Sequence, residues 1–387
     1  MNNDAFLLIN VNTIKENIKT ITEKFNDYKY FIGVVKGNCY GHGFELLRYI
    51  KDTKINYFAV ATIDEAMEVR KYVNKNFPVL ILQPIKINDI KLCIENNLTI
   101  TISNMDFYYE LTKENIKEKL KFHLKLNTGM NRFGIDNKSD VNKIYNDTII
   151  NKKYNLIFEG IYTHLATLGI FDNYFDTQVN RFKYLTEEID LEKIKIVDLV
   201  SSNALVIHKK FDFANGCRIG EIIFGNCMSD INKNGFVNKL KCIKRNYIRN
   251  KLHLSPINET FIIPVKYAIS YYTNIIEIHN IKKGSKIGYD ANYVAENDMT
   301  VAVIPVGYYN GFNVNYKHVF IKDKIYNILD VNMCISIIEI DNEVSIKDNV
   351  YFFNDKLNIN KVTNEVKKSM PYLLSTIPSN IKRIYKD

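Results

Sequence analysis

Eight short apolar runs alternate with longer polar stretches over about the first 225 residues, and this alternation constrains the fold more than any other feature. The runs are rich in β-branched and aromatic residues, as buried strands are, and stretches such as TIDEAMEVRKYV at 62–73 have the spacing of amphipathic helices. Regular alternation of this kind indicates parallel strands joined by helices, and eight repeats predict a closed (β/α)8 barrel of the TIM type better than an open sheet. The runs are FIGVVK (31–36), YFAVA (57–61), PVLIL (78–82), LTITI (98–102), FHLKLN (122–127), FEGIYTH (158–164), IVDLV (196–200) and CRIG (217–220).

The pattern changes after about residue 260. Apolar runs such as TVAVIPVGYY and CISIIEI are now joined by short turns that contain Gly, Asn and Asp. Short strands joined by tight turns are typical of antiparallel sheets. The fold class predicted is therefore α/β plus all-β, with a (β/α)8 barrel over residues 1–230 and a mainly antiparallel β-domain over residues 231–387.

The composition fits a folded protein with two cores. The chain has 387 residues, of which 46% are hydrophobic and 25% are charged. The formal charge of +9 is spread along the chain, so we do not expect a nucleic-acid partner. The exception is the stretch KLKCIKRNYIRNK at 239–251, which concentrates basic residues without any acid. We interpret it as a solvated insertion in preference to a surface for an anionic partner.

The six cysteines indicate neither a metal site nor a disulfide framework, because they form no C-x-x-C pair and have no histidines at zinc spacing. No apolar run approaches the length of a membrane span, and the first residues lack the pattern of an export signal. We therefore expect a cytoplasmic protein that binds no metal and no membrane.

Polar residues stand where several predicted barrel strands end. The chemistry of a (β/α)8 barrel gathers at the carboxyl ends of its strands. Taken singly, a lysine, histidine or glycine at such a position is usually an ordinary cap or turn residue. Their predicted gathering at one rim nevertheless favours a functional site. The residues are Lys36, Asn127, Arg132, His164, Ser201, Ser202, Arg218 and Gly220.

Lys36 is the candidate nucleophile of this rim. A lysine amine is unreactive while protonated, but burial and nearby cations lower its pKa, which is how lysines that bond to aldehydes become reactive. A phosphorylated aldehyde cofactor also needs phosphate donors, which barrels usually offer after strands seven and eight. Ser202, the backbone at Gly220 and the hydroxyl of Tyr40 are the candidates.

The ordered motifs of the chain resemble those of the alanine racemase family, whose members are fold-type III enzymes that depend on pyridoxal phosphate. The resemblance covers nearly the entire chain, and eight blocks in family order make it specific. The blocks are VVKGNCYGHG (34–43), KLNTGMNRFGI (125–135), GIYTHLAT (160–167), VSSNAL (200–205), CRIGEIIFG (217–225), KIGYDANYVAENDMTVAVIPVGYYNGF (286–312), NMCISI (332–337) and MPYLLSTIPSNIKRIY (370–385).

This resemblance implies the catalytic residues. Lys36 matches the lysine that holds pyridoxal phosphate and acts as a base on one face of the substrate. Tyr289 matches the base on the other face, which the partner subunit of a homodimer with shared active sites contributes. Arg218 matches the arginine that faces the pyridine nitrogen, and His164 matches the histidine that links this arginine toward the tyrosine.

The resemblance also implies the binding residues. Tyr40, Ser202, Gly220 and Tyr372 match phosphate-binding positions. The substrate carboxylate is expected at Arg132 and the backbone of Met333. Lys125 matches a lysine that is carbamylated in many family members and positions this arginine. The implied function is interconversion of L- and D-alanine, a small-molecule substrate, for the supply of D-alanine to the cell wall.

The chemistry is consistent with this assignment, because racemisation removes a proton from one face of Cα and delivers one to the other face. Two bases must therefore flank the substrate. Lysine and tyrosine both have high free pKa values and need nearby positive charge to act as bases. An arginine opposite the pyridine nitrogen stays charged and should keep this nitrogen unprotonated, which favours proton transfer over transamination.

Several residues depart from the family pattern close to the expected substrate entrance. Cys334, Asn310 and Gly169 stand where the family commonly has acidic residues, and Val314 stands where an arginine is common. Charges that usually line the channel are therefore absent. We expect an intact catalytic core with an altered substrate preference or rate.

Three alternatives carry different expectations. A racemase of the same fold could prefer another amino acid. A decarboxylase of the same fold type would carry acidic and cysteine motifs in its second domain, which we do not find. A non-catalytic cofactor-binding protein with a single barrel would need neither the β-domain nor Tyr289.

Overall fold

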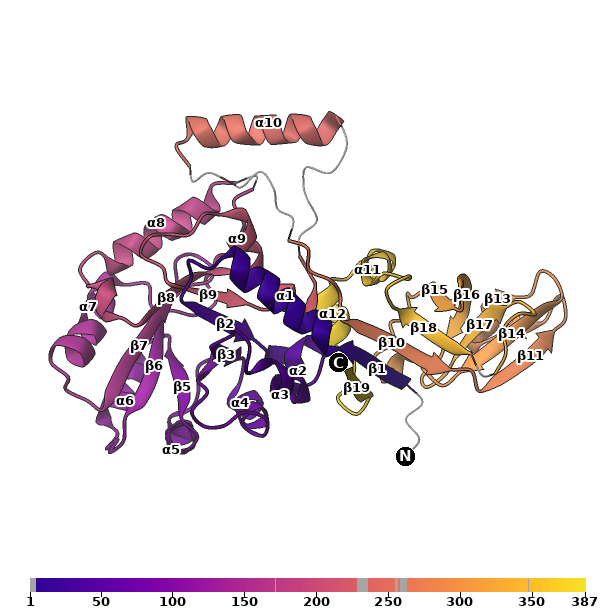
Figure 1. The fold of residues 1–387 in the computed structure, drawn as a ribbon, viewed down its shortest axis with the longest axis horizontal. Coiled ribbons are helices and arrows are strands. Elements are labelled where there is room, and N and C mark those ends of the chain that lie inside the picture. The colour runs from indigo at the N-terminus through magenta and orange to yellow at the C-terminus, as the bar shows by residue number, and fades with distance from the viewer. Residues whose placement is uncertain (1–4, 171, 228–235, 255–256, 258–262, 347) are drawn as a thin grey trace. The chain divides into compact units, whose positions relative to one another are not determined.

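The computed structural model describes residues 5–387 except 171, 228–235, 255–256, 258–262 and 347 (Figure 1). The chain divides into two compact units. The barrel unit comprises Lys15–Lys36 and Leu47–Lys266, and the sheet unit comprises Met1–Ile14, Gly37–Leu46 and Tyr267–Asp387.

Eight parallel strands close the barrel in chain order, and β9 completes the ring by pairing with β2. The predicted (β/α)8 barrel is confirmed. Every strand coincides with a predicted apolar run because strands covered on both faces carry almost no polar residues. The strands are β2 (Tyr30–Val34), β3 (Tyr57–Val60), β4 (Val79–Ile81), β5 (Leu98–Ile102), β6 (Leu120–Lys125), β7 (Leu156–Tyr162), β8 (Ile196–Ser201) and β9 (Gly216–Ile219).

Helices alternate with the barrel strands and most of them cover the outside of the barrel, while α10 is drawn apart from it, above α8 and α9 (Figure 1). Local sequence signals begin several of these helices. The side chain of Thr62 accepts a hydrogen bond from the backbone of Glu65 at the start of α4, and Asn104 does the same for Phe107 at the start of α6. The helices are α1 (Val11–Lys24), α3 (Leu47–Ile50), α4 (Ile63–Arg70), α5 (Ile90–Glu95), α6 (Met105–Lys113), α7 (Lys138–Tyr145), α8 (Tyr174–Thr186), α9 (Ser202–Ile207) and α10 (Phe236–Lys251).

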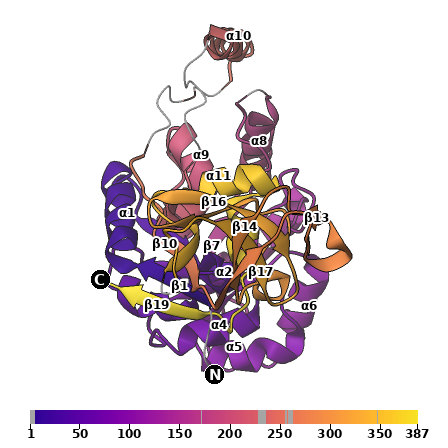
Figure 2. The same cartoon turned by 90° about the vertical axis from the view of Figure 1, so that its right-hand side faces the viewer.

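The sheet unit is built on nine strands in the order β11-β14-β17-β16-β15-β18-β10-β1-β19, several of which face the viewer in Figure 2. All neighbours are antiparallel except β1 and β19, so the predicted mainly antiparallel β-domain is confirmed. The strands are β1 (Ala5–Asn10), β10 (Ile269–Asn274), β11 (Glu277–Ile281), β14 (Met299–Ile304), β15 (His318–Ile321), β16 (Lys324–Val331), β17 (Ser336–Ile340), β18 (Asn349–Phe353) and β19 (Lys382–Lys386), with the separate pair β12 (Lys286–Ile287) and β13 (Tyr293–Val294) and the helices α11 (Ile359–Val366) and α12 (Met370–Ser375).

The division into units differs from a boundary at residue 230. The first strand, β1, lies in the sheet unit because it pairs with β10 and β19, which are more than 250 residues away in sequence. The segment Gly37–Leu46 also belongs there, since Arg383 Nε donates to the carbonyl of Gly41. The described residues between 231 and 266, including α10, belong to the barrel unit. Such long-range pairing leaves no local trace in the sequence.

The described residues contain neither a candidate membrane-spanning helix nor a candidate metal site. None of their helices has both the length and the apolar character needed to cross a membrane. They also contain no group of three or more His, Cys, Asp and Glu residues placed to hold a metal ion.

Candidate active site

The carboxyl ends of the barrel strands bring six of the predicted site residues to one rim. Lys36 follows β2 and Lys125 ends β6. His164 follows β7, and Ser202 begins α9 directly after β8. Arg218 lies in β9, with Gly220 immediately after that strand. The closed barrel therefore places these residues in the region where chemistry is expected.

Arg218 is buried inside the barrel and has a fixed set of partners. Its side chain is only 4% exposed, and its guanidinium forms an ion pair with Asp198, which is fully buried in β8. Nη2 donates to the carbonyl of Thr163 at 2.5 Å. The guanidinium carbon also lies 4.8 Å from the centre of the Tyr162 ring. These contacts hold the arginine in one orientation.

Positive charge dominates this rim. The pKa of Lys36 is lowered, first because the surrounding protein desolvates the charged amine and then because of Arg132. Arg218 adds to this lowering, and Glu65 and Glu221 partly offset it. The Lys36 side chain remains open to solvent. The amine is thus accessible and more easily deprotonated than a free lysine.

Lys125 is buried in the same cluster. Its pKa falls to about 7 because of burial, then Arg132, Arg218 and Lys36. The amine lies 4.0 Å from the centre of the Phe133 ring. A lysine with this pKa is partly neutral at physiological pH and can therefore react as a nucleophile.

His164 is held neutral. Burial lowers its pKa to about 3, with further contributions from Arg218, Arg132, Lys125 and Lys36. Its backbone carbonyl accepts a hydrogen bond from Nε2 of Gln178, which is fully buried in α8. The neutral imidazole can relay a hydrogen bond among cations without adding another positive charge.

The loop after β6 is closed on itself and carries Arg132 at its exposed tip. The side-chain oxygen of Asn127 accepts hydrogen bonds from the backbone of Gly129 and Asn131. Gly134 has φ 137°, and a Cβ there would lie 2.5 Å from the backbone nitrogen of Asn127. Only glycine fits this close approach.

Two of the four predicted phosphate-binding residues lie in the barrel unit and two in the sheet unit. In the barrel unit, the backbone nitrogen of Gly220 donates to Oγ of Ser202 at 2.9 Å. In the sheet unit, Tyr40 lies in a run of left-handed backbone that begins at Gly37. The glycine that follows Tyr40, Gly41, packs so closely on Leu374 of α12 that a Cβ would lie 2.1 Å from its carbonyl oxygen. Helix α12 also carries Tyr372.

The remaining two residues lie on loops of the sheet unit. Tyr289 is 64% exposed, and its backbone nitrogen donates to the carboxylate of Asp330 at 3.1 Å. The preceding Gly288 has φ 78°, and a Cβ there would collide with the same carboxylate. Met333 is 52% exposed, and its carbonyl accepts a hydrogen bond from the backbone of Tyr309. Tyr289 is therefore exposed on a turn whose backbone is held by Asp330.

Two of the departures from the family pattern have local structural roles. Gly169 has φ 62° and a Cβ would lie 2.7 Å from that of Phe175, so an aspartate would be strained there. Asn310 accepts a hydrogen bond from the backbone of Gly307 through its side chain. Cys334 and Val314 are exposed.

Sequence reasoning missed Asp198, Thr163 and Gln178, which hold Arg218 and His164 in place. Asp198 did leave a signal, since it is the one charged residue inside the run IVDLV. A carboxylate in a strand buried on both faces requires a partner. The sequence could not identify Arg218 as that partner, because the two residues meet only through the pairing of β8 with β9.

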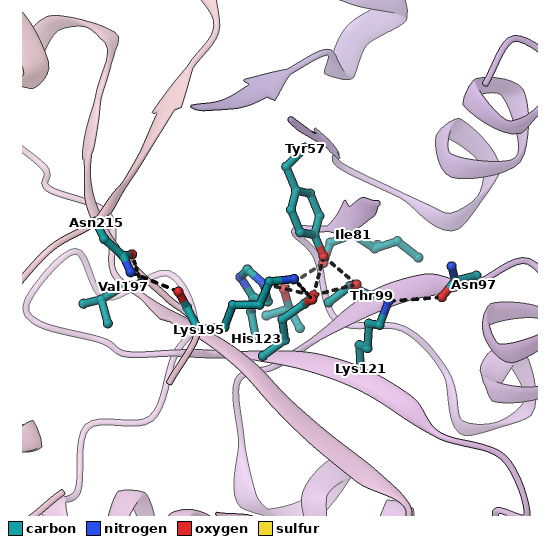
Figure 3. Close-up of polar contacts among 11 residues, drawn as sticks. Tyr57, Ile81, Asn97, Thr99, Lys121, His123, Lys195, Val197 and Asn215 are labelled. Atoms are coloured by element: carbon teal, nitrogen blue, oxygen red, sulfur yellow. Dashed lines mark hydrogen bonds and ion pairs between the residues drawn. The ribbon is translucent and has the colours of Figure 1, made fainter. Parts of the chain in front are cut away.

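A second polar cluster lies in the amino-terminal half of the barrel (Figure 3). The hydroxyl of Tyr57 lies 2.6 Å from Oγ1 of Thr99 and 2.8 Å from the carboxylate of Glu159, which Lys195 also contacts at 2.8 Å. Burial lowers the pKa of the neighbouring His123. This end of a barrel usually serves stability, so we assign the cluster to the core.

Comparison with known proteins identifies the family. Residues 9–227 match the family model described as alanine racemase, N-terminal domain, and residues 268–385 match alanine racemase, C-terminal domain. An alanine racemase of Borreliella burgdorferi is 30% identical over 398 residues, covering 100% of this chain and 98% of that protein. One from Listeria innocua is 29% identical and covers 80% of this chain and 76% of its own length.

Solved structures agree with the fold. An alanine racemase from E. faecalis has a TM-score of 0.84 at 24% identity, covering 99% of this chain and 98% of its own. A histidine racemase from Leuconostoc mesenteroides has a TM-score of 0.82 at 21% identity, covering 100% of this chain and 99% of its own. The two family matches span both units, and the chain therefore belongs to the alanine racemase family.

Proposed function

We propose that this racemase acts on alanine, with pyridoxal phosphate held at Lys36 and with a proton exchanged at Lys36 on one face of the substrate and at Tyr289 of the partner subunit on the other. The observation that carries the proposal is the accessible Lys36 amine, whose pKa is lowered at the carboxyl end of a (β/α)8 barrel. Membership of a family of pyridoxal-phosphate racemases supports the assignment.

The described residues fit this cofactor. Lys36, Lys125 and Arg132 gather positive charge at the rim, next to Arg218 and its partner Asp198, and this charge suits an anionic phosphate and a carboxylate substrate. The Lys36 amine can bond to the aldehyde, and the hydroxyl of Ser202, whose oxygen accepts a hydrogen bond from the Gly220 backbone, can donate its proton to the phosphate. When bound, the cofactor would withdraw electrons from the substrate Cα and so acidify its proton.

Each base has a defined task. The Lys36 amine accepts or donates a proton on its side of the substrate, and its lowered pKa makes the neutral form accessible. The phenol of the partner's Tyr289 does the same on the opposite side. Because each direction of racemisation starts from a different face, the two bases exchange roles between L- and D-alanine.

The other residues position and tune these groups. Arg218, held by Asp198 and the carbonyl of Thr163, would provide a positive charge near the pyridine nitrogen of the bound cofactor. Arg132, on the closed loop after β6, would receive the substrate carboxylate. Neutral His164 can pass a hydrogen bond from Arg218 toward the tyrosine.

The position of Tyr289 on an exposed turn of the sheet unit, where Asp330 holds its backbone, supports a homodimer. An outward tyrosine held by Asp330 is suited to entering the site of a second copy. A symmetric dimer would complete two equivalent sites in this way.

Exchange and racemisation in D2O test the proposed function. The protein purified with pyridoxal phosphate should incorporate deuterium at Cα of L- and D-alanine while optical activity is lost. Lys36→Ala should abolish both signals. Absence of exchange with alanine and with the other common amino acids would refute the racemase assignment. Exchange confined to another amino acid would retain the mechanism but change the substrate, as the exposed Cys334 and Val314 allow.

A further inference from the structure

The helix α10 is attached to the barrel unit by one face. Arg245 and Arg249, spaced one helical turn apart, are 4% and 5% exposed. Nη2 of Arg249 lies 2.9 Å from the carboxylate of Asp176 in α8, and Nη1 donates to the carbonyls of Gly169 and Asp172. The buried arginines therefore define an inner face of α10.

The outer face of α10 carries exposed apolar side chains. Leu240, Ile243 and Tyr247 are 49%, 65% and 67% exposed. At about 100° per residue, these three positions lie on the side of the helix opposite Arg245 and Arg249. We call these three residues the outer stripe. Ile248 and Leu252, which are 42% and 51% exposed, lie on the inner side, where they line a pocket with Ile170. Large apolar residues on an exposed helix face are unusual in a protein that meets only water.

Basic residues accompany the outer stripe. The sequence from 239 to 251 contains six Lys and Arg residues and no Asp or Glu, and two of the six are the buried Arg245 and Arg249 of the inner face. Lys244 and Lys251 are exposed, and the helical spacing places both next to the outer stripe, with Lys244 also lining the pocket on the inner side. The long side chains of lysine can extend past an apolar stripe and keep their amines at a charged interface.

We propose that α10 binds the protein to the surface of an anionic lipid bilayer, lying flat with the outer stripe inserted and its lysines on the headgroups. A basic helix with a narrow apolar face is the form that lies in a membrane interface without crossing it. This inference revises the interpretation of residues 239–251 as a merely solvated insertion. It does not depend on the racemase assignment.

Other occupants fit the outer face less well. Nucleic acid would use the basic residues but has no place for aliphatic side chains on a continuous stripe. A second copy of the same helix would bring like charges together. A folded acidic protein needs roughly 800 Å² on each side for a stable interface, whereas one face of a helix about 24 Å long offers less. A bilayer accepts a single helix face.

The chain contains no tryptophan, which permits a direct test with a single fluorophore. Tyr247→Trp places the indole on the outer stripe. Tyr109→Trp, at a position 43% exposed on α6, is the matched control. Each full-length holo-protein is mixed with vesicles of phosphatidylcholine alone or with phosphatidylglycerol added. The emission of Tyr247→Trp should shift to shorter wavelength only with the anionic vesicles, and the control should not shift.

Charge variants test the electrostatic part. Lys244→Glu with Lys251→Glu should lower vesicle binding in sedimentation assays at least about tenfold. Lys19→Glu with Lys91→Glu makes the same change in net charge at side chains that are 74% and 87% exposed elsewhere on the barrel unit. This control should bind as the unmodified protein does. Both double variants should retain cofactor absorbance.

Several outcomes would overturn the proposal. One is that the emission of Tyr247→Trp does not shift and the protein does not sediment with anionic vesicles at low salt. Another is that both double variants lose vesicle binding equally. If, without lipid, sedimentation showed an assembly of several copies that changes at outer-stripe substitutions, the outer stripe would be assigned to contact with a second copy. Binding to a DNA duplex but not to vesicles would assign it to a general polyanion site.

Discussion

Arg218 and Asp198 form an ion pair in which both side chains are removed from water, one on β9 and the other on β8. The arginine is 4% exposed and the aspartate is fully buried. The pair therefore links the residue expected to face the cofactor ring to a neighbouring strand. A buried charge is stable only while its partner is present, so the orientation of Arg218 depends on Asp198.

Asp198→Asn should reduce the free energy of unfolding by about 3 kcal/mol, because the guanidinium stays buried without a counter-charge. Urea denaturation of the protein monitored by circular dichroism measures this loss. Replacing both partners, as in Asp198→Leu with Arg218→Met, should recover much of the stability. Additive losses in the double variant would show that the two residues are not coupled.

The sequence predicted the barrel well because each strand is buried on both faces and reads as a separate apolar run. Lys36, His164 and Arg218 could be located because strand ends converge in this topology. The partners of these residues could not be predicted. Asp198 meets Arg218 only through the pairing of β8 and β9, and β1 joins the sheet unit through pairing with distant strands. Local patterns carry no information about such registers.

Acid should destabilise the protein partly through His208. Burial lowers the pKa of this histidine to about 4, while its ring stacks on Phe175 at 3.6 Å and Nε2 contacts the carbonyl of Leu168. Between about pH 6.5 and pH 4, the unfolded chain binds a proton that the folded protein excludes. Stability therefore falls with decreasing pH across this window, by up to about 1.4 kcal/mol per pH unit from this residue.

Unfolding free energies measured from pH 7 to pH 4 test this prediction in His208→Gln. The variant should be less stable at pH 7 but should show a shallower fall toward pH 4. An unchanged slope in His208→Gln would contradict the assignment.

Lys125 should react reversibly with carbon dioxide. Its pKa of about 7 leaves roughly half of the amine neutral at neutral pH. The neutral amine would form an N–C bond to carbon dioxide and release one proton, and the product would carry a negative charge among the cations of the rim. With 13C-bicarbonate, NMR should show one carbamate signal that weakens as the pH falls below 7.

Two conservative variants make the assignment specific. Lys125→Arg should remove the carbamate signal because a guanidinium does not form a carbamate. Lys121→Arg, on the same strand, should retain the signal. A signal that survives in Lys125→Arg would place the modification elsewhere.

Mixing two inactive proteins tests whether Tyr289 acts across a dimer. Lys36→Ala lacks one base, and Tyr289→Phe lacks the other but should still bind pyridoxal phosphate. If each site takes its lysine from one subunit and its tyrosine from the other, random exchange restores about a quarter of the wild-type sites. The two proteins are unfolded and refolded together, and the racemisation of alanine is then followed by optical rotation. The control is the same two proteins refolded separately and mixed afterwards. If both bases came from one chain, the heterodimer would contain no complete site and the mixture would stay inactive.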